Sequence, residues 1–360
     1  MNIIYFFTYN VSLNTWRESG QEKRELSRLL KVYNDTGKGK LYIFTYGDKT
    51  EGSFELPNSI KNESIQVIPI YKYFNKSKFK LINFLRSFFY TKKMLKNENF
   101  DLTDADIIYT NQLLGSWVAY TFKKRLKIPL IVRTGYDLYE FSILENKSLI
   151  KKLFYKYLTH FSLNFSDIYT VTSNSDKNFL IGKFKIKDES KIKIRPNWIK
   201  LRASNFNIKD WENRHQNKLV SVGRLEDQKN YSRIIEALKN TNFELDLYGE
   251  GSLKEQLMLQ AKSLDVKVNF MGIKDNNDLL NELEKYKFYI SCSLFEGNPK
   301  GLLEAMSAGC VVIASNIKNH VEFLNNENSI LFSNNDHSLE KIIKNLNSPE
   351  INFSEIVSNS

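Results

Sequence analysis

The chain has 360 residues, of which 42% are hydrophobic and 26% are charged, a composition typical of a folded protein of about two domains. No apolar run approaches the roughly 18 residues of a membrane-spanning helix, and the first ten residues lack the basic start of a signal peptide. Two cysteines and four scattered histidines do not suit a disulfide framework or a zinc site. The composition therefore predicts a cytoplasmic protein and argues against a secreted protein, a membrane-spanning protein or a protein with a structural zinc site.

The net charge of +11 is concentrated in the first half of the chain. Residues 1–197 hold 33 Lys and Arg against 19 Asp and Glu, a balance of +14, whereas the remainder holds 19 against 22, a balance of −3. A basic half indicates an anionic partner such as a membrane surface, a charged substrate or a nucleic acid. Nucleic acid is not expected, because no helix-turn-helix, RNP or zinc-finger pattern accompanies the charge.

The densest basic stretch runs from Lys72 to Lys96 and contains no acidic residue. Leu81, Leu85 and Phe88 recur in it at helical spacing, which predicts an amphipathic helix with a basic face. Two interpretations stay open. The helix contacts an anionic membrane surface, or it packs on a sheet and leaves its lysines in water.

Short apolar segments alternate with helical patterns along the first half of the chain. In chain order, we expect strands at Ile3–Thr8, Leu41–Tyr46, Ile65–Ile70, Ile107–Thr110, Leu130–Arg133 and Ile168–Thr172, and helices at Glu22–Tyr33, Leu114–Leu126 and Leu149–Leu163. Strands separated by helices predict a parallel sheet that is covered on both faces. A linker candidate follows at Ile194–Arg202, where Pro196 ends the last strand.

The same alternation begins again after residue 217. We expect strands at Lys218–Val222, Phe243–Tyr248, Val266–Phe270, Phe288–Ser291 and Val311–Ala314, and helices at Tyr231–Leu238, Leu253–Ser263 and Leu302–Ala308. The predicted fold is α/β, with two doubly wound Rossmann-like domains facing a cleft. The N-terminal domain covers residues 1–197, the C-terminal domain covers 198–347, and 348–360 form a polar tail. Ligands of such sheets bind at the carboxyl ends of the strands.

The first chemical motif is VGRLEDQKN, residues 222–230, between a strand and a helix. Gly223 permits a tight turn, and Arg224 and Lys229 are two cations near a helix N-terminus, a combination that suits a diphosphate. Taken alone, this fragment is better explained as two surface cations on a loop. The glycines of LYGEGSL, residues 247–253, fit a structural turn as well as half of a dinucleotide-binding fingerprint.

The second motif lies in SCSLFEGNPKGLLEAMSAGCVVIAS, residues 291–315, where seven residues separate Glu296 from Glu304. The turn between Gly297 and Gly301 offers backbone N–H groups, and the helix after it favours an anion at its start. We expect Glu304 in the first turn of that helix. Carboxylates accept hydrogen bonds well from sugar hydroxyls. Each acid alone is explained by an exposed loop or by the helix dipole, but their combination, in this order and in the second of two such domains, is not.

These motifs resemble the retaining GT-B glycosyltransferases of glycosyltransferase family 4, also called glycosyl transferases group 1. The similarity covers residues 218–332 through GRLEDQK, LYGEGSL, VNFMG and the E-x7-E segment. The resemblance implies one donor site, formed by Gly223, Arg224, Lys229, Gly272, Ile273, Glu296, Gly297, Asn298, Leu303 and Glu304. In that site Arg224 and Lys229 would hold the diphosphate and Glu296 the sugar hydroxyls. Glu304 would bind the ribose, with Gly272 and Ile273 near the base.

The N-terminal half is less similar to the family. Only Gly20 remains of the glycine pair in the first loop, and Pro196-Asn197-Trp198 replaces the usual Pro-Asn-Gly. IVRTGYD, residues 131–137, stands where many members carry a histidine or aspartate near the reacting carbon. Asp137 is the nearest candidate for that catalytic position.

The resemblance implies sugar transfer, with retention, from a nucleotide-diphosphate sugar to a glycan or lipid-linked hydroxyl acceptor in bacterial surface polysaccharide or glycolipid synthesis. The catalytic set would be Glu296, Arg224, Lys229 and Asp137, with no metal and no cofactor besides the donor. A cytoplasmic location is expected, with the inner membrane face as the site of peripheral contact through Lys72–Lys96. Two alternatives stay open: a nucleotide-sugar epimerase or hydrolase of the same plan, and a non-catalytic nucleotide-sugar-binding module.

Overall fold

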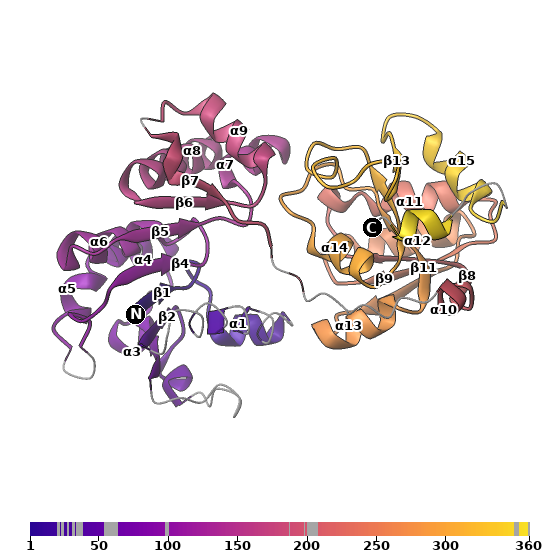
Figure 1. Ribbon diagram of the computed structural model, residues 1–360. Helices are drawn as coiled ribbons and strands as arrows, with labels where there is room; N and C mark the ends of the chain where they lie inside the picture. The colour runs from indigo at the N-terminus through magenta and orange to yellow at the C-terminus, as the bar shows by residue number, and fades with distance from the viewer. Residues whose placement is uncertain are drawn as a thin grey trace. The chain divides into compact units, whose positions relative to one another are not determined.

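The computed structural model describes residues 1–19, 39–53, 64–97, 101–186, 188–197, 199, 208–348 and 353–358, with isolated positions at 22, 25, 26, 29, 30 and 33. The chain divides into two compact units, Met1–Pro196 and Asn197–Ser360, and each is built around one parallel sheet (Figure 1). Six of the twelve residues of the predicted helix Glu22–Tyr33 are described, and all six are helical. The expectations at Gly20 and Trp198 lie outside the described residues.

The sheet of the first unit has seven described strands in the order β3-β2-β1-β4-β5-β6-β7. Their bounds are β1 Ile3–Phe6, β2 Leu41–Thr45, β3 Ile65–Pro69, β4 Ile107–Thr110, β5 Leu130–Arg133, β6 Ile168–Val171 and β7 Ile192–Ile194. Ile3 of β1 is in register with Leu41 of β2 and with Ile107 of β4. The strand order therefore reverses between β1 and β4, which is the ligand-binding point of doubly wound sheets.

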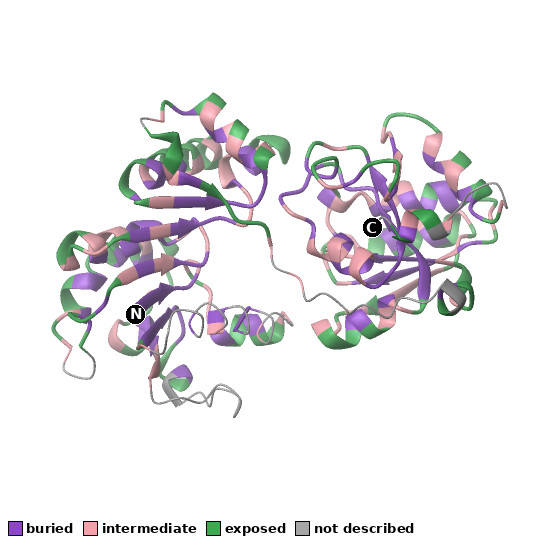
Figure 2. Ribbon diagram, viewed as in Figure 1, coloured by how far each residue is buried: buried purple, intermediate pink, exposed green. Residues whose placement is uncertain are grey.

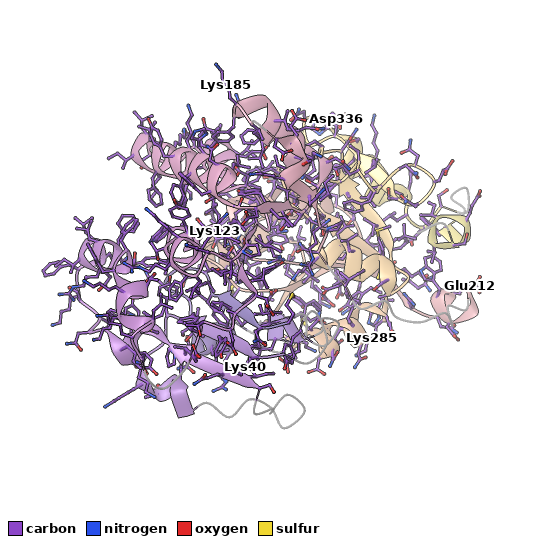
Figure 3. The ribbon with its side chains drawn as sticks, turned by 60° about the vertical axis from the view of Figure 1, so that its left-hand side comes forward. Lys40, Lys123, Lys185, Glu212, Lys285 and Asp336 are labelled. Atoms are coloured by element: carbon purple, nitrogen blue, oxygen red, sulfur yellow. The ribbon has the colours of Figure 1, made fainter. Side chains whose placement is uncertain are left out.

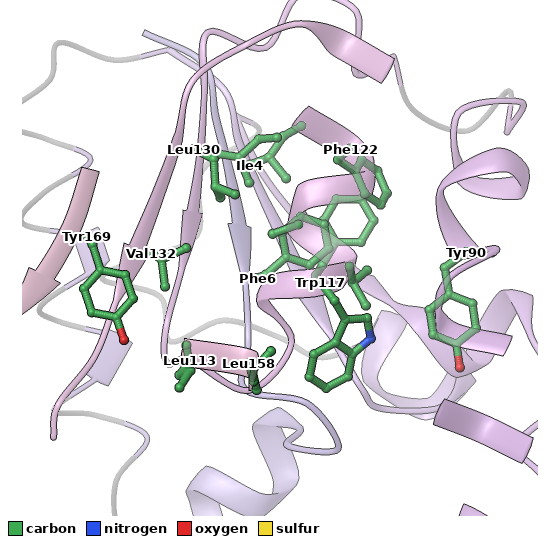
Figure 4. Packing of buried hydrophobic residues seen from close by; sticks show 14 of the residues in the cluster. Ile4, Phe6, Tyr90, Leu113, Trp117, Phe122, Leu130, Val132, Leu158 and Tyr169 are labelled. Atoms are coloured by element: carbon green, nitrogen blue, oxygen red, sulfur yellow. The ribbon is translucent and has the colours of Figure 1, made fainter. Parts of the chain in front are cut away.

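Helices cover both faces of this sheet. They are α1 Leu13–Glu18, α3 Ile70–Tyr73, α4 Lys80–Ser87, α5 Tyr90–Met94, α6 Ser116–Leu126, α7 Leu138–Leu144, α8 Leu149–Phe165 and α9 Asn174–Lys183, with single 3₁₀ turns η1 Lys49–Ser53 and η2 Glu189–Lys191. Since side chains alternate along a strand, Ile4 and Phe6 of β1 enter one core while Ile3 and Tyr5 enter another. Figure 4 shows the first of these cores, in which Phe6 packs against Phe122 with ring centroids 5.0 Å apart.

The second unit repeats the plan with the described strand order β10-β9-β8-β11-β12-β13. Its strands are β8 His215–Val222, β9 Glu244–Tyr248, β10 Val268–Gly272, β11 Tyr286–Ser291, β12 Val311–Ser315 and β13 Ile330–Phe332. Its helices are α10 Ile208–Glu212, α11 Tyr231–Leu238, α12 Lys254–Ser263, α13 Asn276–Leu283, α14 Lys300–Ser307, α15 Ser338–Asn345 and α16 Phe353–Ser358, with the 3₁₀ turn η3 Asp227–Lys229. β11 and β12 are buried along their whole length, and β8 is buried in its second half (Figure 2), as expected for parallel sheets covered on both faces.

The predicted amphipathic helix within Lys72–Lys96 is confirmed as α4, which contains Leu81 and Leu85 and ends just before Phe88. The rest of the segment holds the end of α3 and all of α5, and Leu81 and Leu85 are exposed, so the interpretation in which the apolar side packs on the sheet is wrong. Phe74 and Phe79 have extended backbone, and the Asn83 amide bonds both the N–H and the C=O of Ser77, so the chain turns between α3 and α4.

Two further expectations need correction in the second unit. α14 begins at Lys300, before the predicted start at Leu302, so Glu304 lies in its second turn and not in its first. The expected polar tail contains α16, whose Val357 is buried in the second unit's core. Among the described residues, no helix combines the length and the apolar character needed to cross a bilayer.

Candidate active site

The polar loops of the second unit gather at one edge of its sheet. All its described strands are parallel, so their carboxyl ends meet at that edge. β8 and β11 are neighbours at the point where the strand order reverses. The loop after β8 carries Lys229, and the loop after β11 carries Glu296. The predicted cation and the predicted acid therefore meet at the topological switch point.

Lys229 and Glu296 form an ion pair in which the Lys229 ammonium donates to Oε1 of Glu296. The same oxygen accepts a hydrogen bond from the Ser293 hydroxyl at 2.6 Å, and Oε2 accepts one from the Gln228 amide at 3.3 Å. The Glu296 carboxylate is 7% exposed. The three hydrogen-bond donors offset the free-energy cost of removing the carboxylate charge from water. They also hold the carboxylate in a fixed orientation.

Local chain geometry explains how Lys229 reaches this position. A Cβ at Gly223 would lie 3.0 Å from Cε of Lys229 and 2.8 Å from the Tyr231 hydroxyl, so a larger residue would displace the lysine stem. Asn230 then adopts a left-handed conformation, with φ of 51°, between η3 and α11. Asparagine tolerates that conformation better than most residues. The turn between Gly223 and Asn230 thus places the Lys229 side chain against Gly223, at the end of β8.

The glycines of LYGEGSL bring the loop after β9 against the loop after β8. Gly249 has φ of 144°, and a Cβ there would lie 1.9 Å from the Gly223 carbonyl oxygen. A Cβ at Gly251 would lie 2.4 Å from the carbonyl oxygen of Leu225, which also accepts from the Leu253 N–H at 3.0 Å. These contacts support the structural-turn interpretation of the motif.

A second group of polar residues holds the loop that carries Glu296. Ser315 and Asn334 both donate to the Ser293 carbonyl, at 2.7 and 3.2 Å, and the Asn319 amide donates to the Gly297 carbonyl at 3.0 Å. His320 is fully buried with Nδ1 2.8 Å from the Ser315 carbonyl, and burial lowers its pKa. The imidazole is therefore neutral at neutral pH, and Nδ1 is its protonated, donating nitrogen.

Sequence reasoning missed Gln228, Ser293, Asn319 and His320. A local signal existed for Ser293, which stands three residues before Glu296, and for Gln228, which adjoins Lys229. Asn319 and His320 come from the loop after β12. Only the tertiary pairing of β11 with β12 brings that loop to the site.

Glu304 is buried on α14 and accepts a hydrogen bond of 2.8 Å from the Asn276 amide. A Cβ at Gly301 would lie 3.2 Å from both the Tyr289 hydroxyl and the Val222 carbonyl oxygen, so the start of α14 packs closely on β8 and β11. This puts the positive end of the helix dipole next to the switch point.

The remaining predicted residues lie around this centre. Arg224 and Ile273 are exposed, whereas Gly272 and Leu303 are partly exposed. The Asn298 side-chain oxygen accepts from the Asn197 N–H at 3.1 Å, and the Asn298 carbonyl accepts from the Asn197 amide at 2.9 Å. Asn298 is therefore tied to the segment that begins the second unit.

Asp137 is the predicted residue that the structure assigns to a different role. Its side chain has no exposed surface, and it caps α7 by accepting from the Glu140 N–H at 2.8 Å and from the Thr159 hydroxyl at 3.3 Å. Burial raises its pKa to about 7. A carboxyl group enclosed in this way cannot touch a substrate, so we correct the catalytic expectation and assign Asp137 to the fold.

Two doubly wound units, with an ion-paired polar edge in the second, have the architecture of the GT-B class of glycosyltransferases. A family model described as Glycosyltransferase Family 4 matches residues 40–202, and one described as Glycosyl transferases group 1 matches residues 204–356. Together these matches cover most of the chain, which therefore belongs to glycosyltransferase family 4.

Characterised relatives agree with this membership. The chain is 26% identical over 284 residues to a Campylobacter jejuni GalNAc-alpha-(1->4)-GalNAc-alpha-(1->3)-diNAcBac-PP-undecaprenol alpha-1,4-N-acetyl-D-galactosaminyltransferase, covering 77% of this chain and 72% of the relative. It is 28% identical over 263 residues to an Escherichia coli UDP-Gal:alpha-D-GlcNAc-diphosphoundecaprenol alpha-1,3-galactosyltransferase, covering 69% and 66%. The chain thus matches about two thirds to three quarters of these relatives' own lengths.

Solved structures show the same fold. HepE of Anabaena, crystallised with UDP and glucose, matches with a TM-score of 0.70 at 16% identity, covering 100% of this chain and 93% of that chain. Sucrose-phosphate synthase of Thermosynechococcus elongatus matches with a TM-score of 0.75 at 15% identity and the same coverage.

Proposed function

We propose that this glycosyltransferase moves a sugar from a nucleoside-diphosphate sugar to a hydroxyl of a lipid-linked or other glycan acceptor during synthesis of a bacterial surface glycan. The observation that carries the proposal is the Lys229–Glu296 pair at the switch point of the second sheet. The names of the undecaprenol-linked relatives support the acceptor class.

In the proposed donor site, Arg224 and Lys229 bind the diphosphate and Glu296 binds sugar hydroxyls. An ammonium has three N–H donors, so Lys229 can keep its bond to Glu296 while it donates to a phosphate oxygen. The backbone of Gly297 and Asn298 lies beside the sugar. Glu304 binds the ribose, and Gly272, Ile273 and Leu303 lie toward the nucleoside.

The proposed reaction breaks the bond between the anomeric carbon and the diphosphate oxygen, and the electron pair stays with the nucleoside diphosphate. The acceptor oxygen bonds the same carbon from the same face, which retains configuration, and its proton passes to the departing phosphate oxygen. Arg224, Lys229 and the start of α14 stabilise the charge on the leaving group. Glu296 orients the sugar and does not act as a nucleophile.

We further propose that this stabilisation needs no metal and no cofactor besides the donor. Two cations and a helix start supply the positive potential that a divalent ion supplies in other transferases. The acceptor side belongs to the basic first unit, which we propose contacts an anionic membrane surface through the Lys72–Lys96 segment, at the inner face of the cell membrane.

The test is an incorporation assay with the full chain and radiolabelled UDP- and GDP-sugars, with and without a bacterial lipid extract. A transferase gives a labelled product that depends on the extract. Donor turnover that is equal without the extract would favour an epimerase or hydrolase. Donor binding without any turnover would favour a non-catalytic module.

A further inference from the structure

Helix α4 exposes most of its apolar residues and buries its two uncharged polar ones. Leu81 is 68% exposed and Leu85 is 54% exposed, whereas Asn83 and Ser87 are buried. Asn83 holds the Ser77 backbone through two hydrogen bonds, and Ser87 accepts one of 2.7 Å from the Trp117 indole N–H. A water-facing surface helix has the opposite arrangement, with its apolar stripe against the core.

The first half of α8 has the same character. Leu149 and Ile150 are 71% and 81% exposed, although the helix is anchored to the unit by its second half. There Thr159 and Ser162 are buried, and the Ser162 hydroxyl lies 2.8 Å from that of Ser116. The anchored half fixes the direction in which the exposed apolar half projects.

The two apolar surfaces are continuous. The rings of Phe84 on α4 and Phe154 on α8 meet edge to face, with centroids 6.0 Å apart. We call the joint surface the α4–α8 platform; its large exposed apolar residues are Phe79, Leu81, Ile82, Leu85, Phe88, Phe89, Leu149, Ile150, Leu153, Phe154 and Tyr157. Contiguous exposed apolar patches of this kind mark interaction surfaces.

Exposed lysines accompany the platform and lack acidic partners. No ion pair is formed by Lys78, Lys80, Lys151 or Lys156 with any residue that the structure describes. Elsewhere in the unit, Lys40 and Lys123, both labelled in Figure 3, pair with Asp104 and Asp167 at 2.7 and 2.6 Å.

Apolar side chains flanked by unneutralised lysines match the chemistry of one partner in particular. Acyl chains accommodate the apolar residues, and anionic headgroups accommodate the ammonium groups. A protein partner would have to supply both an apolar face and a ring of acids.

The platform lies toward the carboxyl edge of the first sheet. α6 is the next element after β4, and its second residue, Trp117, contacts Phe84 and Phe88 of the α4 region. α8 ends just before β6 begins, so its first half lies toward the opposite edge, at the carboxyl ends of the strands. Ligands of doubly wound sheets bind at that edge.

We infer that the α4–α8 platform inserts into the interface of an anionic bilayer, so that apolar burial as well as charge holds the first unit at the membrane. The inference rests on the proposed function, because a lipid-linked acceptor would be presented at that surface. It extends the contact beyond the Lys72–Lys96 segment to α8 and makes part of the binding resistant to salt.

The test is vesicle co-sedimentation of the full chain with phosphatidylglycerol-containing and with purely phosphatidylcholine vesicles, at low salt and at about 0.5 M NaCl. The variants are L81S/L85S on α4 and L149S/I150S on α8; the matched control is Leu259→Ser, a 70% exposed leucine on α12 of the second unit. We expect salt-resistant binding of the wild type and the control to anionic vesicles, with about a tenfold or larger loss in both platform variants. Platform variants that bind like the wild type would overturn the inference.

A second measurement tests insertion directly. Ile150→Trp should give indole fluorescence that brominated phosphatidylglycerol vesicles quench, while a tryptophan placed at Leu259 should not be quenched. An absence of quenching at position 150 would contradict insertion. A dimer in gel filtration that L149S/I150S dissociates would assign the platform to a second copy of the chain and would also overturn it.

The membrane inference and the proposed function can fail independently of each other. UDP and GDP binding, measured by thermal shift, should be unchanged in L81S/L85S and L149S/I150S, because these residues belong to the first unit. Wild-type-like vesicle binding by both platform variants, with intact transfer in detergent, would refute the platform alone. Vesicle binding without any sugar transfer would refute the proposed function alone.

Discussion

The two units share a strand order but differ in what stands at the carboxyl edge of the sheet. In the second unit the edge is polar and internally bonded, since Lys229, Gln228 and Ser293 all hold Glu296. In the first unit the acid predicted to be catalytic, Asp137, is buried as a helix cap, and apolar residues are exposed elsewhere in that unit. The strand topology determines where a ligand site lies, while the loops determine its chemistry.

The largest effect should come from breaking the ion pair of the second unit. We expect Lys229→Ala and Glu296→Ala each to lower the transfer rate by about 100-fold or more, because each removes an electrostatic contact that is fixed before the reaction. Initial rates of sugar incorporation at saturating donor measure this effect. Lys262→Ala, an exposed lysine on α12, is the control and should keep the wild-type rate. Rates within twofold of the wild type for both site variants would contradict the assignment.

Two glycine substitutions, one in each unit, test how closely the loops of the second unit pack. Gly251→Ala should destabilise the second unit by about 1–3 kcal/mol, because its Cβ would lie 2.4 Å from the Leu225 carbonyl oxygen. Gly182→Ala, in α9 of the first unit, meets nothing within 4 Å and should be neutral or slightly stabilising. Calorimetric unfolding of both variants measures the difference, and equal shifts of the melting temperature would be evidence against the close loop packing.

The stabilities of the two units should also change with pH in opposite directions. Burial raises the pKa of Asp137 from 3.8 to about 7, so the stability contributed by its neutral form is complete below about pH 4 and is lost as the pH rises toward 7. Burial lowers the pKa of His320 below its ordinary 6.5, so the second unit loses stability as the pH falls through that value.

Asp137→Asn tests the first half of this statement. The amide keeps an oxygen for the Glu140 N–H but cannot ionise, so the fall in melting temperature between pH 5 and about 7.5 should become smaller than in the wild type. Part of the fall should persist, because burial also raises the pKa of Asp176, to about 6. A pH profile identical to that of the wild type would show that Asp137 is not the titrating group.

The smallest expected effect is that of metal removal. If Arg224, Lys229 and the start of α14 stabilise the leaving group, transfer in excess EDTA should stay within about twofold of the untreated rate. A loss that added Mg²⁺ or Mn²⁺ restores would show that the second unit needs an ion after all.

Local signals in the sequence predict much of the sheet framework. β4 and β5 match their predicted bounds, Ile107–Thr110 and Leu130–Arg133, and α11 matches Tyr231–Leu238, because compact apolar patterns define them. The Lys229–Glu296 contact follows from two motifs placed after strands that become neighbours in a doubly wound sheet.

The errors arise where distant residues decide the outcome. An apolar stripe shows that α4 is amphipathic, but not that Asn83 and Ser87 occupy its buried side. The position of Asp137 after a strand looks catalytic until Thr159, 22 residues further along the chain, covers it. His320 joins the site only through the pairing of β11 with β12.

The most direct test of the central claim is calorimetric titration of the wild type and of the R224A/K229A variant with UDP and GDP, and with the nucleosides uridine and guanosine. In the wild type, one diphosphate should bind at least about tenfold more tightly than its nucleoside, because charge-assisted bonds hold the phosphates. The double variant should lose that preference and keep the affinity for the nucleoside. An unchanged preference in the double variant would contradict the assignment of these two cations to the donor diphosphate.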